Sequence, residues 1–310
     1  MMQMERILVM MSTYNGERFL RTQLDSILNQ TGVDIHLLVR DDGSTDGSLE
    51  ILREYSREDG RITVLEEENC GAIRSFYRLM DYAARQYSDF SYFAFSDQDD
   101  YWYPDKLSRA ISMNSNHAVN YFYHSCYEVV DAKLDEQFKS TVANTKGTLG
   151  EALISNQSIG CSEVFTYEVL AQSARIIDYK LKDKKYYPYH DLWVYLVALA
   201  TKADVVFDSY CGLKYRQHGH NVIGTGRSKV QTCRAQFKNL MAARNLKSGF
   251  AGILLDLLSV DVDVRKKLLK VSSYRDSLRG RMSLAFDKCF RTEVREKNIA
   301  FILSVLCGSF

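Results

Sequence analysis

A chain of 310 residues, of which 46% are apolar, is long enough for one large domain or for a domain with an appendage, and it can bury a substantial core. Its seven cysteines show no C-x-x-C spacing, which argues against a zinc site or a disulfide framework and fits a reducing cytoplasm. No apolar run reaches the ~18 residues of a membrane-spanning helix, and the first residues lack the layout of a signal peptide, so we expect a protein that is made and kept inside the cell.

The net charge of +1 conceals an uneven distribution along the chain. Residues 227–297 contain 17 Lys and Arg against 7 Asp and Glu, which leaves the rest of the chain acidic. We therefore expect an acidic body over residues 1–226 and a basic C-terminal region over residues 227–310.

Short apolar runs and amphipathic segments alternate four times in the first hundred residues. The predicted strands are Ile7–Met11, Ile35–Val39, Arg61–Leu65 and Phe90–Phe95, and helices are predicted between them. This alternation predicts an α/β fold with a mostly parallel central sheet, flanked by helices that form right-handed crossovers.

Polar loops follow three of these strands, at Ser12–Gly16, Asp41–Ser44 and Asp97–Asp100. The last is the most unusual, because a buried aromatic strand stops at three carboxylates within four positions. Alone it fits a solvated acidic turn as well as a site for Mg²⁺ or Mn²⁺. Because such loops gather at one edge of a parallel sheet, their joint occurrence favours a ligand site. Neither G-x-G-x-x-G nor G-x-x-x-x-G-K-[ST] is present, so phosphates would need a metal.

The second half offers two further candidates. Asp191 opens a predicted apolar helix, Leu192–Ala200, where a carboxylate is either a helix cap or a general base. Two short strands, Val205–Phe207 and Leu213–Arg216, then lead to His218 and His220, which lie among glycines and are available as ligands.

The basic C-terminal region is predicted to be helical from the spacing of its apolar residues. Its final apolar stretch, Ile299–Cys307, is too short to span a bilayer but suits an interfacial helix beside a basic surface. An ordinary helical appendage packed on the body or on a second subunit is the alternative. Nucleic acid is not expected as a partner, because no binding motif accompanies the positive charge.

Taken together, Met11–Gly16, Asp41–Asp46 and Ser96–Asp100 resemble family-2 glycosyltransferases of the GT-A (Rossmann-like) fold. More narrowly, Ser96–Leu107, His190–Trp193 and Tyr215–Val222 resemble the rhamnosyltransferase-like subgroup. The resemblance covers about residues 5–225. It implies a nucleotide-sugar donor, a divalent metal (Mn²⁺ or Mg²⁺) and inversion at the anomeric carbon, with residues 1–115 as the nucleotide-sugar-binding half and residues 116–226 as the acceptor half.

The resemblance also implies roles for individual residues. Those expected to contact the nucleotide sugar are Thr13, Tyr14, Asn15, Asp41, Asp42, Arg74, Asp97 and Gln98. Those expected on the acceptor or sugar side are Asp100, Trp102, His190 and Trp193. Asp99 and His218 are expected to bind the metal, with His218 preferred over His220, and Asp191 is expected to be the general base.

The expected activity is the transfer of L-rhamnose from dTDP-rhamnose to a cell-surface polysaccharide or a lipid-linked acceptor. A UDP-hexose-dependent transferase and a non-catalytic saccharide-assembly subunit with the same fold are the alternatives. We expect a cytoplasmic protein at the inner face of the membrane, in peripheral contact with it through the C-terminal region.

Overall fold

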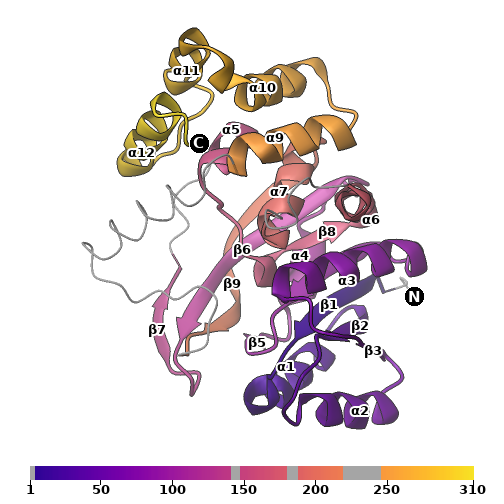
Figure 1. The fold of residues 1–310 in the computed structure, drawn as a ribbon. Helices are drawn as coiled ribbons and strands as arrows, with labels where there is room; N and C mark the ends of the chain where they lie inside the picture. Colours follow the sequence, from indigo (N-terminus) through magenta and orange to yellow (C-terminus); the bar gives the residue numbers. More distant parts are fainter. Residues whose placement is uncertain (1–3, 141–146, 180–187, 219–245) are drawn as a thin grey trace.

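The computed structural model describes residues 4–140, 147–179, 188–218 and 246–310, which build one nine-stranded sheet covered by helices (Figure 1). The strand order is β3-β2-β1-β4-β8-β6-β9-β5, and β7 pairs with β6 outside this path. The first four strands are parallel, as predicted, and have these bounds: β1 Arg6–Thr13, β2 Asp34–Asp41, β3 Ile62–Glu66 and β4 Tyr92–Ser96. The helices between them are α1 Glu17–Leu28, α2 Ser48–Glu58 and α3 Ala72–Gln86.

The second half of the sheet is mixed. Its strands are β5 Tyr101–Trp102, β6 Tyr121–Val130, β7 Glu136–Lys139, β8 Val164–Thr166 and β9 Asp204–Arg216. The short β8 runs antiparallel to both β4 and β6, whereas β9 runs parallel to β6. The two short strands predicted after residue 204 are one long strand, β9. Its register on β6 shifts near Cys126, and this irregularity breaks the apolar pattern in the sequence.

Alternating side chains of the buried strands supply two hydrophobic layers. In β1, Leu8 and Met10 face a layer built with α3, whereas Ile7 and Val9 face the layer that contains α1 and α2. A strand covered by helices on both faces needs apolar residues at every position, which explains the continuous apolar run at the start of the chain.

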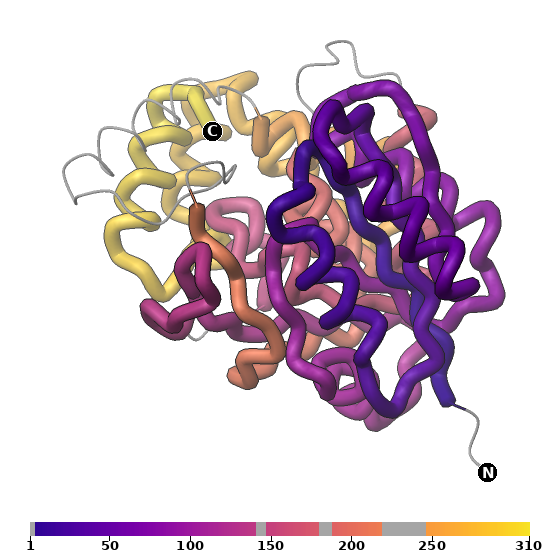
Figure 2. Tube along the Cα trace, turned by 90° about the horizontal axis from the view of Figure 1, so that it is seen from below, coloured from indigo at the N-terminus to yellow at the C-terminus, as the bar shows by residue number. Residues whose placement is uncertain are grey.

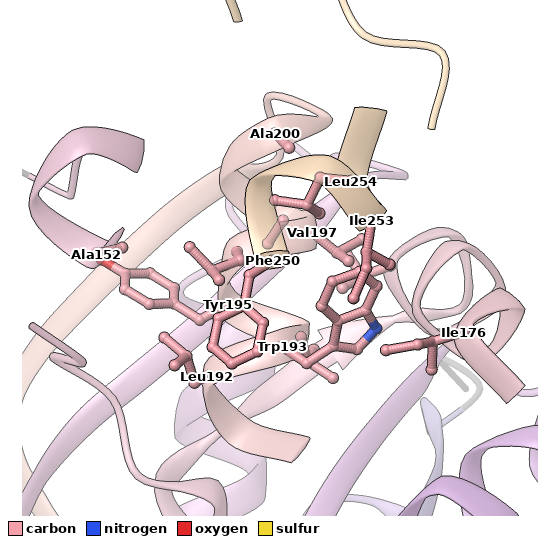
Figure 3. Close-up of a cluster of buried hydrophobic side chains, with 14 of the residues drawn as sticks. Ala152, Ile176, Leu192, Trp193, Tyr195, Val197, Ala200, Phe250, Ile253 and Leu254 are labelled. Carbon is pink, nitrogen blue, oxygen red and sulfur yellow. The ribbon is translucent and has the colours of Figure 1, made fainter. Parts of the chain in front are cut away.

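The layer on the α3 side continues into the second half of the chain. It includes α6 Tyr167–Ala174, α7 His190–Ala200 and α9 Leu246–Leu257. Figure 3 shows Trp193 of α7 beside Ile176 and beside Ile253 of α9. Because α9 contributes to this core, the start of the described C-terminal region is packed on the body.

The rest of the C-terminal region is helical, as predicted, and forms one end of the molecule (Figures 1 and 2). Its helices are α10 Val262–Ser272, α11 Leu278–Ala285 and α12 Arg295–Leu306. Within the final apolar stretch, Phe301 and Val305 are buried, whereas Ile299 and Leu303 are exposed. The final helix is therefore both a packed element and a source of exposed apolar surface. No described helix is long and apolar enough to cross a bilayer.

Candidate active site

The loops that follow β1 and β4 are joined by one amide side chain. Gln98 Oε1 accepts hydrogen bonds from Thr13 Oγ1 at 2.6 Å and from the Tyr14 N–H at 2.9 Å, and Gln98 Nε2 donates to the Tyr14 carbonyl at 3.2 Å. Asn15 Oδ1 accepts the N–H of Thr45 at 2.8 Å, which attaches the loop after β2. The structure thus brings together the three loops that the sequence placed at one edge of the sheet.

Two of the residues assigned to the donor hold these loops in shape. The Asp41 carboxylate accepts from the N–H of Ser44 at 2.9 Å and from its hydroxyl at 2.5 Å. Asp42 is buried, and its carboxylate accepts from Arg40, from the Cys70 N–H at 2.8 Å and from the Gly71 N–H at 2.9 Å. Both carboxylate oxygens of Asp42 therefore already accept hydrogen bonds within the protein. A direct contact of Asp42 with a nucleotide stays a prediction.

Arg74 lies in the first turn of α3, close in sequence to the Cys70–Gly71 turn that binds Asp42, and it is exposed. Its contact with a nucleotide also stays a prediction.

The acidic loop after β4 meets the end of β9. Asp99 Oδ2 lies 2.6 Å from His218 Nε2, although the two residues are 119 positions apart. Arg216 donates its backbone N–H to Asp100 Oδ1 at 3.1 Å and its Nε–H to the Asp99 carbonyl at 2.6 Å. The end of β9 is thereby held against the loop. The alternative ligand, His220, lies outside the described residues.

Asp97, Asp100 and Cys161 offer ligand atoms that all lie within 4.8 Å of one another. Burial raises the pKa of Asp97 to about 7, with further contributions from the charges of Asp99 and Asp191. Burial also raises the pKa of Asp100 well above its usual range, and its Oδ2 has no hydrogen-bond partner among the described residues. Burial and the charge of a neighbouring carboxylate both raise the pKa of a carboxyl group. A bound divalent cation would lower these pKa values again and favour the ionised carboxylates. The residues present therefore fit a cation.

Asp191 is the second residue of α7, after Tyr189 at the N-cap, so it does not cap the helix. Its Oδ1 accepts the Leu192 N–H at 2.7 Å, and its Oδ2 accepts from Asn156 Nδ2 at 3.1 Å. Burial raises the pKa of Asp191 to about 6, against the lowering effect of these two hydrogen bonds. A carboxylate with such a pKa is largely ionised at neutral pH and basic enough to take a proton.

His190, which precedes Asp191 in the chain, is held by aromatic rings. Its imidazole stacks on Phe76 at a centroid distance of 3.7 Å and meets Phe95 edge-on at 4.7 Å. Burial lowers its pKa to about 3, so the ring is neutral. A Cβ on Gly160 would lie 2.6 Å from His190 Nε2, which explains why glycine occupies this position.

Both tryptophans assigned to the acceptor or sugar side are core residues, which corrects the prediction. Trp193 is fully buried, and its indole N–H donates to the Ser173 carbonyl at 2.9 Å. Trp102 is also buried, with the ammonium group of Lys106 3.8 Å from its ring centroid. Asp100, assigned to the same side, is the fully buried last residue of the acidic loop and presents no surface to an acceptor. Of that group, only His190 is partly exposed, and its contact with an acceptor or sugar stays a prediction.

Sequence reasoning missed three polar residues around the site. Lys106 is buried, burial lowers its pKa to about 8, and it lies close enough to Asp100 and Cys161 for their charges to act on it. Lys247, in the first turn of α9, also has its pKa lowered to about 8 by burial, against the effect of the Asp191 charge. Asn156 positions Asp191. A lone Lys or Asn in sequence is typical of a solvated surface, so only the folded structure, in which Lys106 is buried and Lys247 and Asn156 lie near Asp191, could identify them.

Comparison with known proteins agrees with this architecture. The model of the family "Glycosyl transferase family 2" matches residues 8–167. The chain is 30% identical over 247 residues to the dTDP-rhamnosyl transferase RfbG of Shigella flexneri, covering 76% of this chain and 79% of that protein. It is 32% identical over 157 residues to the Escherichia coli UDP-Glc:alpha-D-GlcNAc-diphosphoundecaprenol beta-1,3-glucosyltransferase WfgD, covering 50% of this chain and 58% of that protein.

Among solved structures, S. aureus TarS 1-349 in complex with UDP-GlcNAc superposes with a TM-score of 0.57 at 15% identity, over 97% of this chain and 90% of that one. This likeness supports the GT-A fold predicted from the sequence. The family match, together with the relative that shares 30% identity over three quarters of the chain, shows that this protein belongs to glycosyl transferase family 2 and is a glycosyltransferase of the GT-A fold.

Proposed function

We propose that this protein is an inverting, metal-dependent glycosyltransferase that moves L-rhamnose from dTDP-rhamnose to a saccharide or lipid-linked acceptor. The observation that carries the proposal is the position of Asp191, a half-buried carboxylate whose pKa is raised to about 6 and which lies close enough to Asp97 for its charge to raise the pKa of Asp97. The donor is suggested by the name of the relative from Shigella flexneri. A UDP-hexose donor is the second candidate, supported by the name of the relative from Escherichia coli.

In this proposal Asp191 takes the proton from an acceptor hydroxyl while that oxygen bonds to the anomeric carbon and the nucleoside diphosphate leaves. Direct displacement inverts the anomeric centre and needs one base and no covalent nucleophile. The hydrogen bonds from Leu192 and Asn156 orient the carboxylate.

The proposed metal ligands are Asp99 and His218, and Asp97 lies close enough to Asp99 for the Asp99 charge to act on it. Their oxygen and nitrogen atoms are the donors that Mn²⁺ accepts, and oxygen suits Mg²⁺. When bound, the ion would supply positive charge to the diphosphate leaving group.

Replacing Asp99 with Asn is expected to weaken Mn²⁺ binding more than about 100-fold, because the substitution removes the charge that pairs with the ion. The measurement is a titration of Mn²⁺ followed by electron paramagnetic resonance. Asp105→Asn is the matched control, since Asp105 is an exposed carboxylate of the same segment, bonded to the Tyr210 hydroxyl at 2.6 Å. Equal Mn²⁺ affinity in wild type and Asp99→Asn would refute the ligand assignment.

The donor assignment is tested by measuring nucleotide release from dTDP-rhamnose and a panel of UDP-hexoses, with and without Mn²⁺ and with bacterial lipid extract as acceptor source. Release from dTDP-rhamnose above all others supports the proposal, and release from one UDP-hexose supports the second candidate. If no donor is turned over and no nucleotide binds, the catalytic proposal fails and the non-catalytic subunit remains.

The C-terminal helices carry the surface that would meet a membrane. Leu278 and Met282 lie one turn apart on α11, and Ile299 and Leu303 lie one turn apart on α12. All four side chains are exposed, Leu278 by 75% of its area, and the two helices pack on each other. Exposed apolar residues in a basic region suit the headgroup layer of an anionic membrane.

Replacing Leu278, Met282 and Leu303 together with Ser is expected to weaken binding to anionic lipid vesicles by about tenfold or more, because each change removes apolar surface from the interface. Vesicle co-sedimentation measures this. Val119→Ser, an equally exposed apolar residue before β6, is the control and should bind as wild type does. Unchanged binding of the triple variant would overturn the membrane assignment. Deleting the whole region is a poorer test, because α9 packs in the core.

A further inference from the structure

Phe19 is an aromatic residue that belongs to neither of the two hydrophobic layers built by the described residues. It lies in the first turn of α1, where its backbone N–H donates to the Gly16 carbonyl at 3.0 Å. Its neighbour Leu20 is fully buried in the core, whereas Phe19 itself is half-buried. The hydrophobic core therefore does not account for an aromatic ring at this position.

Three nitrogen-bearing side chains surround the ring of Phe19. The imidazole of His218 lies 4.9 Å from it, measured between ring centroids, with the two planes tilted by 33°. The guanidinium carbons of Arg216 and Arg18 lie 4.5 Å and 4.9 Å from the centroid of the Phe19 ring. The face of an aromatic ring carries partial negative charge, so it attracts guanidinium groups and packs favourably against an imidazole.

Arg216 connects this ring to two loops. Its Nε–H donates to the Asp99 carbonyl at 2.6 Å, and its Nη1–H donates to the Ala132 carbonyl, in the turn between β6 and β7, also at 2.6 Å. Arg216 is buried. Its guanidinium is thus packed on Phe19 while its N–H groups bind backbone carbonyls, and this fixes the end of β9 that leads to His218.

His218 is held from two directions. Its Nε2 lies 2.6 Å from Asp99 Oδ2, and its ring packs on Phe19. The side chain of His218 is only 12% exposed. A ligand whose ring is already oriented loses less conformational freedom when an ion binds, so contacts that orient the imidazole should raise the affinity for the metal.

We infer that Phe19 is a positioning residue for the metal site, because its ring holds the His218 imidazole in the orientation that directs Nε2 towards Asp99. The inference rests on the proposed function, since it takes His218 and Asp99 as the metal ligands. Phe19 follows shortly after Gly16, where the loop after β1 ends. The first turn of α1 thereby links the loop assigned to the donor with the metal site.

The test compares Phe19→Leu and Phe19→Met, which keep apolar bulk without the ring, with Phe19→Tyr, which keeps the aromatic face. Binding of Mn²⁺ to the full-length protein is measured by electron paramagnetic resonance. We expect Phe19→Leu and Phe19→Met to weaken Mn²⁺ binding about 10- to 100-fold, the range typical of residues that orient a metal ligand. Phe19→Tyr should restore the wild-type affinity.

A second measurement uses the metal-free protein. The motion of the His218 imidazole is followed by NMR relaxation of its ring C–H groups, with His218→Gln to assign the signals. The ring should be as rigid as the backbone in the wild type and in Phe19→Tyr, and it should lose this order in Phe19→Leu and Phe19→Met. A residue that contributed only to overall stability would leave the order of this ring unchanged in a folded variant.

Phe90→Leu is the matched control. The ring of Phe90 also packs on an arginine and a histidine, with the Arg6 guanidinium 4.0 Å and the His36 ring 6.1 Å from its centroid. Phe90 lies before the start of β4, whereas the acidic loop follows the end of that strand. Phe90→Leu should therefore bind Mn²⁺ as the wild type does. Melting temperatures measured on all samples show that the variants are folded.

Wild-type Mn²⁺ affinity and wild-type imidazole order in folded Phe19→Leu and Phe19→Met would overturn the inference. An equal loss of affinity in Phe19→Tyr or in Phe90→Leu would overturn it as well. A wild type that binds no Mn²⁺ refutes the metal assignment of the proposed function, and the order of the imidazole in the metal-free variants then decides whether Phe19 orients His218.

Discussion

Asp191→Asn is expected to lower kcat by about 10²- to 10⁴-fold, because a sugar hydroxyl without a base is a poor nucleophile. The KM for the donor should change little, since Asp191 is assigned to the acceptor's proton and not to the nucleotide. Single-turnover transfer and equilibrium binding of the nucleoside diphosphate separate these two effects.

The same variant should not be destabilised. Burial raises the pKa of Asp191 from its ordinary value to about 6, so at neutral pH the folded state holds a carboxylate whose ionised form is disfavoured relative to the unfolded chain. The neutral amide removes that penalty but leaves one of the two donors, the Leu192 N–H or Asn156 Nδ2–H, without an acceptor, so the two effects oppose each other and the melting temperature should change little. Asp204→Asn, at the exposed start of β9, is the control and should retain full activity. Activity above a tenth of the wild-type value in Asp191→Asn would contradict the role of the base.

Arg40→Met is expected to destabilise the fold by about 3–5 kcal/mol, because it leaves a buried charge without its partner. Arg40 is fully buried and donates to Asp42, to the Ser75 hydroxyl at 2.9 Å and to the Glu68 carbonyl at 2.8 Å. Its loss would leave the Asp42 carboxylate buried beside the donor loops with only two backbone donors.

The free energies of unfolding of Arg40→Met and Arg53→Met, measured with urea, are compared with that of the wild type. Arg53 pairs with Glu66 through two hydrogen bonds, but both side chains are about half exposed, so its loss should cost less than about 1 kcal/mol. Similar midpoints for the two variants would show that the Arg40 network adds nothing to stability.

Sequence patterns predicted the features that depend on residues close together in the chain, namely the strands of the first half and the polar loops after them. Continuous apolar runs marked the strands of the first half, because both faces of that sheet are covered. Carboxylates directly after such strands marked the edge where ligands bind, and the structure places Asp99 beside His218 as a pair.

These patterns could not predict contacts between residues that are far apart in the sequence. Most residues of α7 are buried all round, so no stripe in its sequence could show that Trp193 is fully buried in the core while Asp191 stays partly exposed. The contact of Asn156 with Asp191 joins two segments 35 residues apart, and no periodicity records it. For the same reason the sequence did not show that α9 belongs to the core of the body.

The pH dependence of kcat, measured with saturating Mn²⁺ and donor, tests the proton transfer to Asp191 most directly. The charged and titratable groups that act on Asp191 or respond to it are Lys247 of α9, the buried Glu163 before β8, and Asp97. The base is active when ionised, so kcat should be constant above its pKa and fall tenfold per pH unit below about pH 6. The residual activity of Asp191→Asn should lack this limb. A wild-type rate that does not change between about pH 5 and pH 8, or the same limb in Asp191→Asn, would contradict the assignment of Asp191 as the general base.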